Sequence, residues 1–345
     1  MALIGIDCRF ASLSVGLGTY TRNIVSNLVS TSQDSFVLFV RSVDEQWLNE
    51  INSKNFEVHL ANFPHYSVKE QLFFPRIIRK STAELLYSPH FNIPLFCPVK
   101  TVITVHDLIL HRYPNAASFI KRLAYRLVFK NAVTNAKHII AVSNFTQREL
   151  VSLYGELLSD KTTVVTEGFD ASFVPTSNST VLDFYDLKPG YFLYVGTAKQ
   201  HKNVQMLIDA YAKSGVSEPL IIVSNGKEVD QLQMCDGVRI LLGVDNDELP
   251  ALYSAAGCFV TASAYEGFCL PILEARACGR PVIASDVSAI PEIAGEHALL
   301  IGLSEEHLIS AFKDPPTVCD PLEGKHDWAI SAKIISDILK DVLHG

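Results

Sequence analysis

Two carboxylates, Glu266 and Glu274, flank a segment reading EGFCLPILEA that directly follows the apolar run CFVTAS. We expect Gly267 to adopt an unusual backbone angle and Pro271 to lie in the first turn of a helix that contains Glu274. The positive end of that helix would offer backbone N–H groups to an anion or to sugar hydroxyls. These groups belong to Phe268, Cys269 and Leu270. The whole segment suits a ligand with both sugar and phosphate, whereas either glutamate alone is more typical of a solvated charge.

Residues 196–203, which read GTAKQHKN, form a second loop between the apolar run YFLYV and a predicted helix. A turn at Gly196, the cation Lys202 and the start of a helix together favour a phosphate site, because they combine positive charge with backbone hydrogen bonds. The alternative for Lys202 is an ordinary solvated lysine.

Two glycines, Gly16 and Gly18, precede the first predicted helix. Thr21 stands where a dinucleotide-binding fingerprint has its third glycine, and the second predicted strand ends in Arg41 rather than in an acidic residue. A nicotinamide-dependent dehydrogenase is therefore disfavoured.

His106 follows the apolar run TVITV and is expected at the end of a strand. Its imidazole would donate a hydrogen bond to a sugar hydroxyl or carbonyl, with the neighbouring Asp107 tuning it. A single histidine is more often structural, so that alternative stays open.

The segment EGFCLPILEA resembles the signature of glycosyltransferase family 4, in which seven residues separate two glutamates. The resemblance covers nearly the whole chain. It implies that Glu266 contacts the transferred sugar, and that Glu274 binds the ribose hydroxyls of a nucleotide. It also implies that the backbone from Gly267 onward holds the sugar and the diphosphate. By the same resemblance, His106 contacts the donor sugar near the reacting centre.

The loop at Gly196 resembles the family's donor-diphosphate loop, and Lys202 matches its lysine. Two positions depart from the pattern, because many members carry arginine where this chain has Thr197 and His201. The resemblance implies that other cations compensate, and the candidates are Arg276, Lys199 and His201. It also implies that the backbone at Gly16 and Gly18 approaches the donor phosphate and the acceptor.

Short apolar runs alternate with amphipathic, helix-length segments, seven runs before residue 170 and six after it, which predicts parallel α/β units. The fold implied by the resemblance is the glycosyltransferase B fold, with two Rossmann-like doubly wound domains facing across a cleft. We expect an acceptor-binding domain over 1–172 and a donor-binding domain over 173–325. The helix expected over 326–345 could pack against either domain, and packing back on the first is one of the two alternatives.

The 345 residues are 48% hydrophobic and carry a net charge of −8, which argues against a general nucleic-acid binder. Seven cysteines show no metal-ligand spacing, and no signal peptide or membrane span is visible, so a cytoplasmic protein is expected. Two basic stretches, 69–80 and 121–130, indicate either peripheral contact with the inner face of the cytoplasmic membrane or solvated helix edges.

The function implied is a retaining, metal-independent hexosyl transfer, foremost of mannose from GDP-mannose, to a glycan or lipid-linked saccharide in surface polysaccharide synthesis. No cofactor and no metal are expected, since Lys202 and the helix-end amides would stabilise the leaving diphosphate. Two alternatives remain open: the same enzyme class with a UDP-sugar donor, and a nucleotide-sugar-binding protein without turnover.

Overall fold

A computed structural model describes residues 2–13, 16–113, 119–319, 322, 324 and 326–345. The chain forms two compact units. The first unit contains Met1–Gly168 and His326–Gly345, and the second contains Phe169–Lys325.

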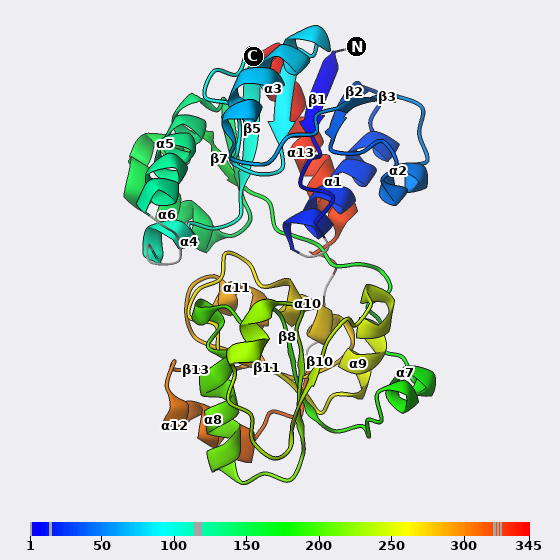
Figure 1. Ribbon diagram of the computed structural model, residues 1–345, viewed down its shortest axis with the longest axis vertical. Helices are drawn as coiled ribbons and strands as arrows, with labels where there is room; N and C mark the ends of the chain where they lie inside the picture. Colours follow the sequence, from blue (N-terminus) through cyan, green and yellow to red (C-terminus); the bar gives the residue numbers. More distant parts are fainter. Residues whose placement is uncertain (1, 14–15, 114–118, 320–321, 323, 325) are drawn as a thin grey trace. The chain divides into compact units, whose positions relative to one another are not determined.

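The first unit is built on a seven-stranded sheet in the order β3-β2-β1-β4-β5-β6-β7, with every neighbouring pair parallel (Figure 1). Because helices cover both faces, most of its strands are continuous apolar runs, whereas the edge strand with Glu57 and His59 alternates. The strands are β1 (Leu3–Asp7), β2 (Ser35–Val40), β3 (Phe56–Leu60), β4 (Leu85–Ser88), β5 (Lys100–Val105), β6 (His138–Ala141) and β7 (Thr162–Val164). The helices are α1 (Leu17–Thr31), α2 (Gln46–Glu50), α3 (Val68–Lys80), α4 (Ile109–Arg112), α5 (Phe119–Asn135), α6 (Asn144–Tyr154), the 3₁₀ helix η2 (Glu156–Lys161) and α13 (Trp328–His344).

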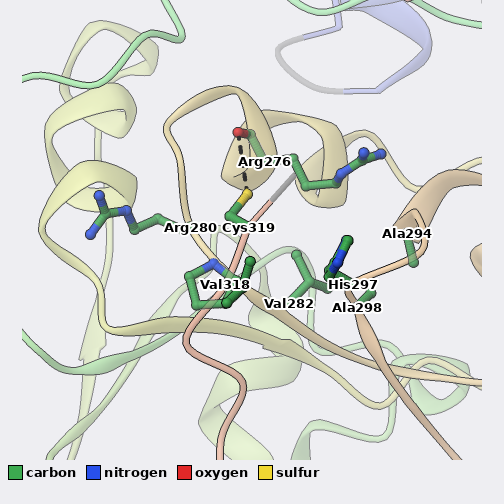
Figure 2. A pocket seen from close by; sticks show the side chains of 9 residues that line it. Arg276, Arg280, Val282, Ala294, His297, Ala298, Val318 and Cys319 are labelled. Atoms are coloured by element: carbon green, nitrogen blue, oxygen red, sulfur yellow. Dashed lines mark hydrogen bonds between the residues drawn. The ribbon is translucent and has the colours of Figure 1, made fainter. Parts of the chain in front are cut away.

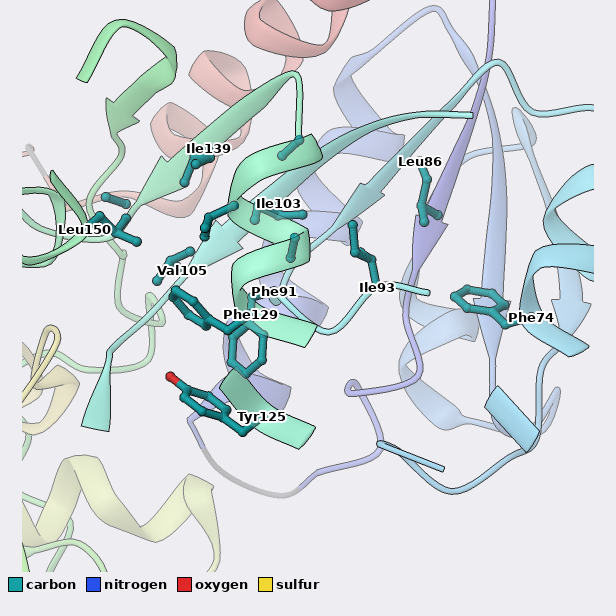
Figure 3. Packing of buried hydrophobic residues seen from close by; sticks show 14 of the residues in the cluster. Phe74, Leu86, Phe91, Ile93, Ile103, Val105, Tyr125, Phe129, Ile139 and Leu150 are labelled. Atoms are coloured by element: carbon teal, nitrogen blue, oxygen red, sulfur yellow. The ribbon is translucent and has the colours of Figure 1, made fainter. Parts of the chain in front are cut away.

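The core of this unit lies where α3, α5 and α6 cover one face of the sheet (Figure 3). Phe74 of α3 and Phe129 of α5 are fully buried there against strand residues such as Ile103. Alternate strand residues face α1 and α13, which contact each other. On that side Tyr20 of α1 hydrogen-bonds the hydroxyl of Tyr87 at 3.3 Å.

The second unit is built on a six-stranded parallel sheet in the order β10-β9-β8-β11-β12-β13. Its strands are β8 (Phe192–Val195), β9 (Leu220–Val223), β10 (Val238–Leu241), β11 (Cys258–Thr261), β12 (Val282–Ser285) and β13 (Leu299–Ile301). Its helices are α7 (Ser179–Phe184), α8 (Val204–Ser214), α9 (Leu249–Ala255), α10 (Leu270–Ala277), α11 (Ile290–Ala294) and α12 (Glu305–Lys313), with the 3₁₀ helices η3 (Gln200–Lys202), η4 (Lys227–Gln231) and η5 (Asn246–Glu248).

Both sheets reverse their strand order once, between β1 and β4 in the first unit and between β8 and β11 in the second. In open parallel sheets, ligands bind beyond the carboxyl ends of the strands at such a reversal. The loop with Gly196 follows β8 and the loop with Glu266 follows β11, so both predicted loops flank the reversal in the second unit.

The two-unit α/β fold and the thirteen strands expected from the apolar runs are confirmed. None of the helices in the described ranges is both long and apolar enough to cross a bilayer.

Candidate functional site

The two predicted loops of the second unit meet through an ion pair between Lys202 and Glu266. The Lys202 ammonium donates a hydrogen bond to Oε1 of Glu266. Only 20% of the lysine side chain and 13% of the glutamate side chain are exposed, so solvent screens this pair little. The structure therefore brings together the cation and the carboxylate that the sequence placed in separate motifs.

Backbone contacts hold these loops in place. The Ala264 N–H donates to the His201 carbonyl at 2.7 Å, and the Asn203 side chain donates to the Ala262 carbonyl at 3.0 Å. Asn203 itself has φ 51°, which lets the chain turn from η3 into α8. The N–H of Glu266 donates to Oγ of Ser288 at 3.0 Å, so the loop after β12 fixes this residue as well.

Helix α10 begins at Leu270, with Pro271 in its first turn as expected. The expectation for Gly267 is corrected, because the unusual backbone angle in this segment is carried by Cys269, with φ 92°. A non-glycine residue rarely adopts a positive φ, and such strain persists only where the surroundings enforce it. Phe268 and Cys269 are both buried and thus support the start of the helix.

Glu274 lies one turn into α10, where its Oε2 accepts a hydrogen bond of 2.8 Å from the Tyr253 hydroxyl. Burial raises the pKa of Glu274 from its ordinary 4.5 to about 7, although the bond from Tyr253 opposes the rise. This carboxyl therefore titrates near neutral pH, as is common at functional sites.

Gly196 has φ 151°, and a side chain there would have its Cβ 2.9 Å from the Tyr194 hydroxyl. The same hydroxyl donates to the carbonyl of the half-buried Thr197 at 2.8 Å. The glycine is thus required by the packing of Tyr194 beneath the loop.

The three cations considered as compensation for the missing arginines lie in different surroundings. Burial and the adjacent charge of Lys202 lower the pKa of His201 to about 4, so it is neutral at pH 7. Arg276 donates to the Ile293 carbonyl at 2.8 Å and lines a small cavity with Arg280 and Cys319 (Figure 2). Lys199 is exposed on the loop.

In the first unit, Gly16 is the N-cap of α1 with φ 56°, and Gly18 lies inside that helix. A Cβ on Gly18 would stand 1.9 Å from the Leu13 carbonyl oxygen. Close approach of the chain's own backbone therefore already requires this glycine, without a ligand.

His106 lies beyond the end of β5, as predicted, but both of its ring nitrogens have partners in the protein. Nδ1 is 3.0 Å from Oε1 of Glu167, and Nε2 is 2.9 Å from the Pro89 carbonyl oxygen. The carboxylate beside the ring is thus Glu167, which the sequence did not single out for this role. Asp107 instead accepts from the N–H of Ile109 at the start of α4.

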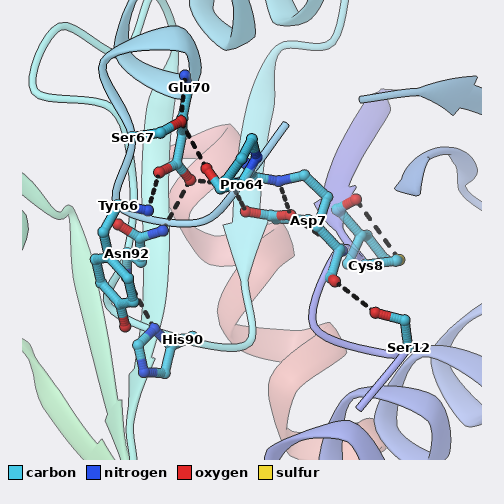
Figure 4. Close-up of polar contacts among 11 residues, drawn as sticks. Asp7, Cys8, Ser12, Pro64, Tyr66, Ser67, Glu70, His90 and Asn92 are labelled. Atoms are coloured by element: carbon cyan, nitrogen blue, oxygen red, sulfur yellow. Dashed lines mark hydrogen bonds and ion pairs between the residues drawn. The ribbon is translucent and has the colours of Figure 1, made fainter. Parts of the chain in front are cut away.

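The structure also contains a network of buried charged side chains near the ends of β1 and β4, which the sequence did not predict as a network (Figure 4). Arg9 contacts Asp7 at 2.6 Å and Glu70 at 2.7 Å, with all three side chains fully buried. Glu70 further accepts from Asn92 at 2.7 Å and from the N–H of Tyr66 at 2.6 Å. A charged residue inside the apolar segment IDCRF was the available signal, because buried charges need partners.

Among the described residues, no group of three or more His, Cys, Asp or Glu side chains is placed to hold a metal ion. The arrangement in the second unit is instead a lysine, a carboxylate and a helix N-terminus beside a sheet reversal. Such a set offers charge and N–H donors to an anion and acceptors to hydroxyls.

Two doubly wound units of this kind define the glycosyltransferase B fold class, and solved structures bear this out. The chain is similar to a sucrose-phosphate synthase from Thermosynechococcus elongatus, with a TM-score of 0.76 and 19% identity over all of both chains. It is also similar to HepE from Anabaena, solved with UDP and glucose, with a TM-score of 0.74 and 18% identity over 99% of this chain and 100% of that one.

Sequence comparisons give the family. Residues 15–173 match the model for Glycosyltransferase Family 4, and residues 184–311 match that for Glycosyl transferases group 1. The O-antigen chain mannosyltransferase B of Escherichia coli is 32% identical over 66% of this chain and 63% of its own length. The O-antigen chain mannosyltransferase RfbU of Salmonella typhimurium is 31% identical over 67% of this chain and 64% of its own length. These matches span less than two thirds of either relative. The chain belongs to the glycosyltransferase family that the two matched models describe.

Proposed function

We propose that the protein is a glycosyltransferase that moves a hexose, foremost mannose from GDP-mannose, to a glycan or lipid-linked saccharide in surface polysaccharide synthesis. The observation that carries this proposal is the meeting of Lys202, Glu266 and the start of α10 at the sheet reversal of the second unit. The printed names of the mannosyltransferase relatives support the choice of sugar.

The ion pair suggests how the donor enters this site. A diphosphate brings negative charge that replaces Glu266 as the partner of Lys202. Glu266 is then free to accept hydrogen bonds from the sugar hydroxyls, while Glu274 accepts from the ribose. Donor binding thus exchanges one charge pair for another, so that no buried charge is left alone.

In the proposed reaction, the acceptor oxygen bonds to the anomeric carbon on the face from which the diphosphate leaves, so configuration is retained. The bond from the anomeric carbon to the phosphate oxygen breaks, and the acceptor proton passes to an oxygen of the departing phosphate. Lys202 and the α10 amides stabilise the leaving charge, which is the task a divalent cation performs elsewhere.

The direct test is nucleotide release from a panel of GDP-mannose, UDP-glucose and UDP-galactose, with acceptor extract, in the presence and absence of EDTA. We expect release from GDP-mannose that EDTA does not abolish. Release from a UDP-sugar alone would reassign the donor, and a metal requirement would overturn the metal-free mechanism. Donor binding without any release would favour the non-catalytic binding protein.

A matched pair of variants tests the phosphate role of Lys202. Lys202→Met should weaken donor binding at least tenfold, because it removes a charge-assisted contact worth about 1.5–3 kcal/mol. Lys188→Met removes an exposed lysine of the same unit that lies outside the predicted donor loops, and it serves as the control. Equal donor affinities in the two variants, measured by calorimetry, would refute the role of Lys202.

We further propose that α3 and α5 contact an anionic membrane surface that carries a lipid-linked acceptor. Leu72, Phe73 and Phe96 are exposed apolar residues, and the Arg76 guanidinium lies 5.7 Å from the Phe73 ring centre. A loop links the two helices, since the side chains of Gln71 and Asn131 bond the backbone of Leu95. Lys121, in the second basic stretch, lies outside the side chains that the structure describes.

Vesicle sedimentation tests this surface, because apolar and basic residues together favour anionic lipid. The protein should sediment with phosphatidylglycerol vesicles and remain in solution with phosphatidylcholine. The double variant Leu72→Gln, Phe73→Gln should lose binding, whereas Leu157→Gln, at an exposed leucine of η2, should keep it. Equal binding by both variants would remove the surface from the proposal.

A further inference from the structure

The surroundings of His106 determine its protonation state. Nδ1 faces a carboxylate oxygen of Glu167, and Nε2 faces the carbonyl oxygen of Pro89. Both partners accept hydrogen bonds, and a neutral imidazole has only one N–H to donate. A neutral ring would therefore leave one nitrogen lone pair against an oxygen, so the contacts are satisfied together only by the doubly protonated ring.

Other groups around the ring do not reverse this conclusion. Tyr20 of α1 meets the ring edge-on with centroids 4.5 Å apart, and His90, beyond β4, stacks at 6.4 Å. Burial lowers the pKa of His90, which is therefore neutral at pH 7. Burial also opposes charge on His106, but Glu167, with smaller contributions from Pro89 and Asp107, outweighs it and raises the pKa of His106 above its ordinary value.

Glu167 also lies where the chain passes between the two units. The chain leaves the first unit after Gly168 and returns to it at His326. Nδ1 of His326 is 3.3 Å from the Glu167 carbonyl oxygen, and Ser331 donates to the Thr166 carbonyl at 2.7 Å. The outgoing and the returning segments are thus fixed to each other at the residue whose side chain contacts His106.

We propose that Glu167 is a positioning residue that keeps His106 doubly protonated and correctly oriented, and that ties this state to the two segments joining the units. The inference rests on the proposed function only in taking His106 as a residue that contacts the donor sugar, as the family resemblance implies. A change in the path of residues 166–168 would move the carboxylate that orients the ring, so the geometry of this segment acts on His106 through Glu167.

Nitrogen-15 NMR of the histidine-labelled full chain tests the proposal without any assay of activity. His106, assigned by the signal lost in His106→Gln, should titrate above its ordinary range in the wild type. In Glu167→Gln its midpoint should fall by about one pH unit or more, because removing an adjacent opposite charge has effects of that size. Glu167→Asp should restore part of the shift.

Glu57→Gln is the matched control, because Glu57 pairs with His59 at 3.1 Å on an exposed strand of the same unit. It should leave the His106 titration unchanged. If Glu167→Gln also leaves it unchanged while the protein stays folded, the proposal is overturned. In the transfer reaction, kcat should decline as the pH rises and His106 loses its second proton. In Glu167→Gln this decline should begin at a lower pH than in the wild type, while KM for the donor changes less. Absence of transfer by the wild type would count against the proposed function alone, since the NMR result stands independently.

Discussion

The carboxyl of Glu274 gives the second unit a pH-dependent stability. Its pKa of about 7 in the folded chain compares with an ordinary 4.5. At 1.36 kcal/mol per pKa unit, this difference corresponds to an upper limit of about 3 kcal/mol. Between these two pH values the folded chain holds a proton that the unfolded chain has released, so the free energy of unfolding falls as pH rises from about 4.5 to about 7.

Glu274→Gln removes the titration and keeps an oxygen that accepts from Tyr253. We therefore expect the variant to match the wild type near pH 4.5 and to be more stable by up to about 3 kcal/mol at pH 8. Both tryptophans, Trp47 and Trp328, belong to the first unit, so tryptophan fluorescence would report on the wrong part of the chain. Hydrogen exchange of β11 and α10 amides, with both proteins compared at the same pH, measures the relevant opening.

The exposed Glu296→Gln provides the control for loss of a carboxylate in the same unit. If the free-energy difference between wild type and Glu274→Gln is the same at pH 5 and pH 8, the raised pKa of Glu274 is refuted. The same titration should act on ligand binding, because only the ionised carboxylate accepts from two ribose hydroxyls. Donor affinity should therefore rise by up to about tenfold between pH 6 and pH 8 in the wild type and stay level in the variant.

Two further predictions concern the first unit, where tryptophan fluorescence does report unfolding. Arg9→Met leaves Asp7 and Glu70 buried without their shared cation, so urea unfolding should show a loss of about 3–5 kcal/mol. A loss below 1 kcal/mol would contradict a charged network at this place. Gly168→Ala puts a Cβ 2.5 Å from the backbone nitrogen of Trp328, so it should destabilise the packing of α13 by about 1–3 kcal/mol and alter Trp328 fluorescence. An unchanged spectrum and midpoint would show that the segment has more room than the structure gives it.

The sequence predicted the sheets because most strands, such as β2, β4, β9 and β12, are buried on both faces and read as apolar runs between turns. The sequence did not predict the short helices α2, α4, α7 and α11, since five, four, six and five residues are too few to show a helical period. α12 was missed although it has nine residues.

The sequence predicted the individual loops of the candidate site, but it did not predict which side chains of these loops contact one another. Strand ends at a sheet reversal come together, so the loops after β8 and β11 had to be neighbours. Nothing in the sequence shows that Lys202 would take Glu266 as its partner, because that depends on side-chain directions in two irregular loops. The same holds for His106 and Glu167, which lie 61 residues apart and meet only because β5, β6 and β7 are adjacent in the sheet.

The net charge of the second unit is negative, so individual side chains rather than the net charge must attract an anionic donor. Residues 169–325, which form this unit, contain 10 Lys and Arg against 21 Asp and Glu, a net charge of −11, yet the unit is proposed to bind an anionic donor. His201 is neutral, so the positive charge that the sequence offered for a diphosphate comes from Lys199, Lys202 and Arg276, and of these Lys202 is paired with Glu266. Because the partner of Lys202 is the carboxylate proposed to bind the sugar, diphosphate binding and sugar recognition are coupled. We therefore expect a ligand that pairs with Lys202 but offers no hydroxyls to Glu266 to bind more weakly than the complete nucleotide sugar, because it leaves a largely buried carboxylate unpaired.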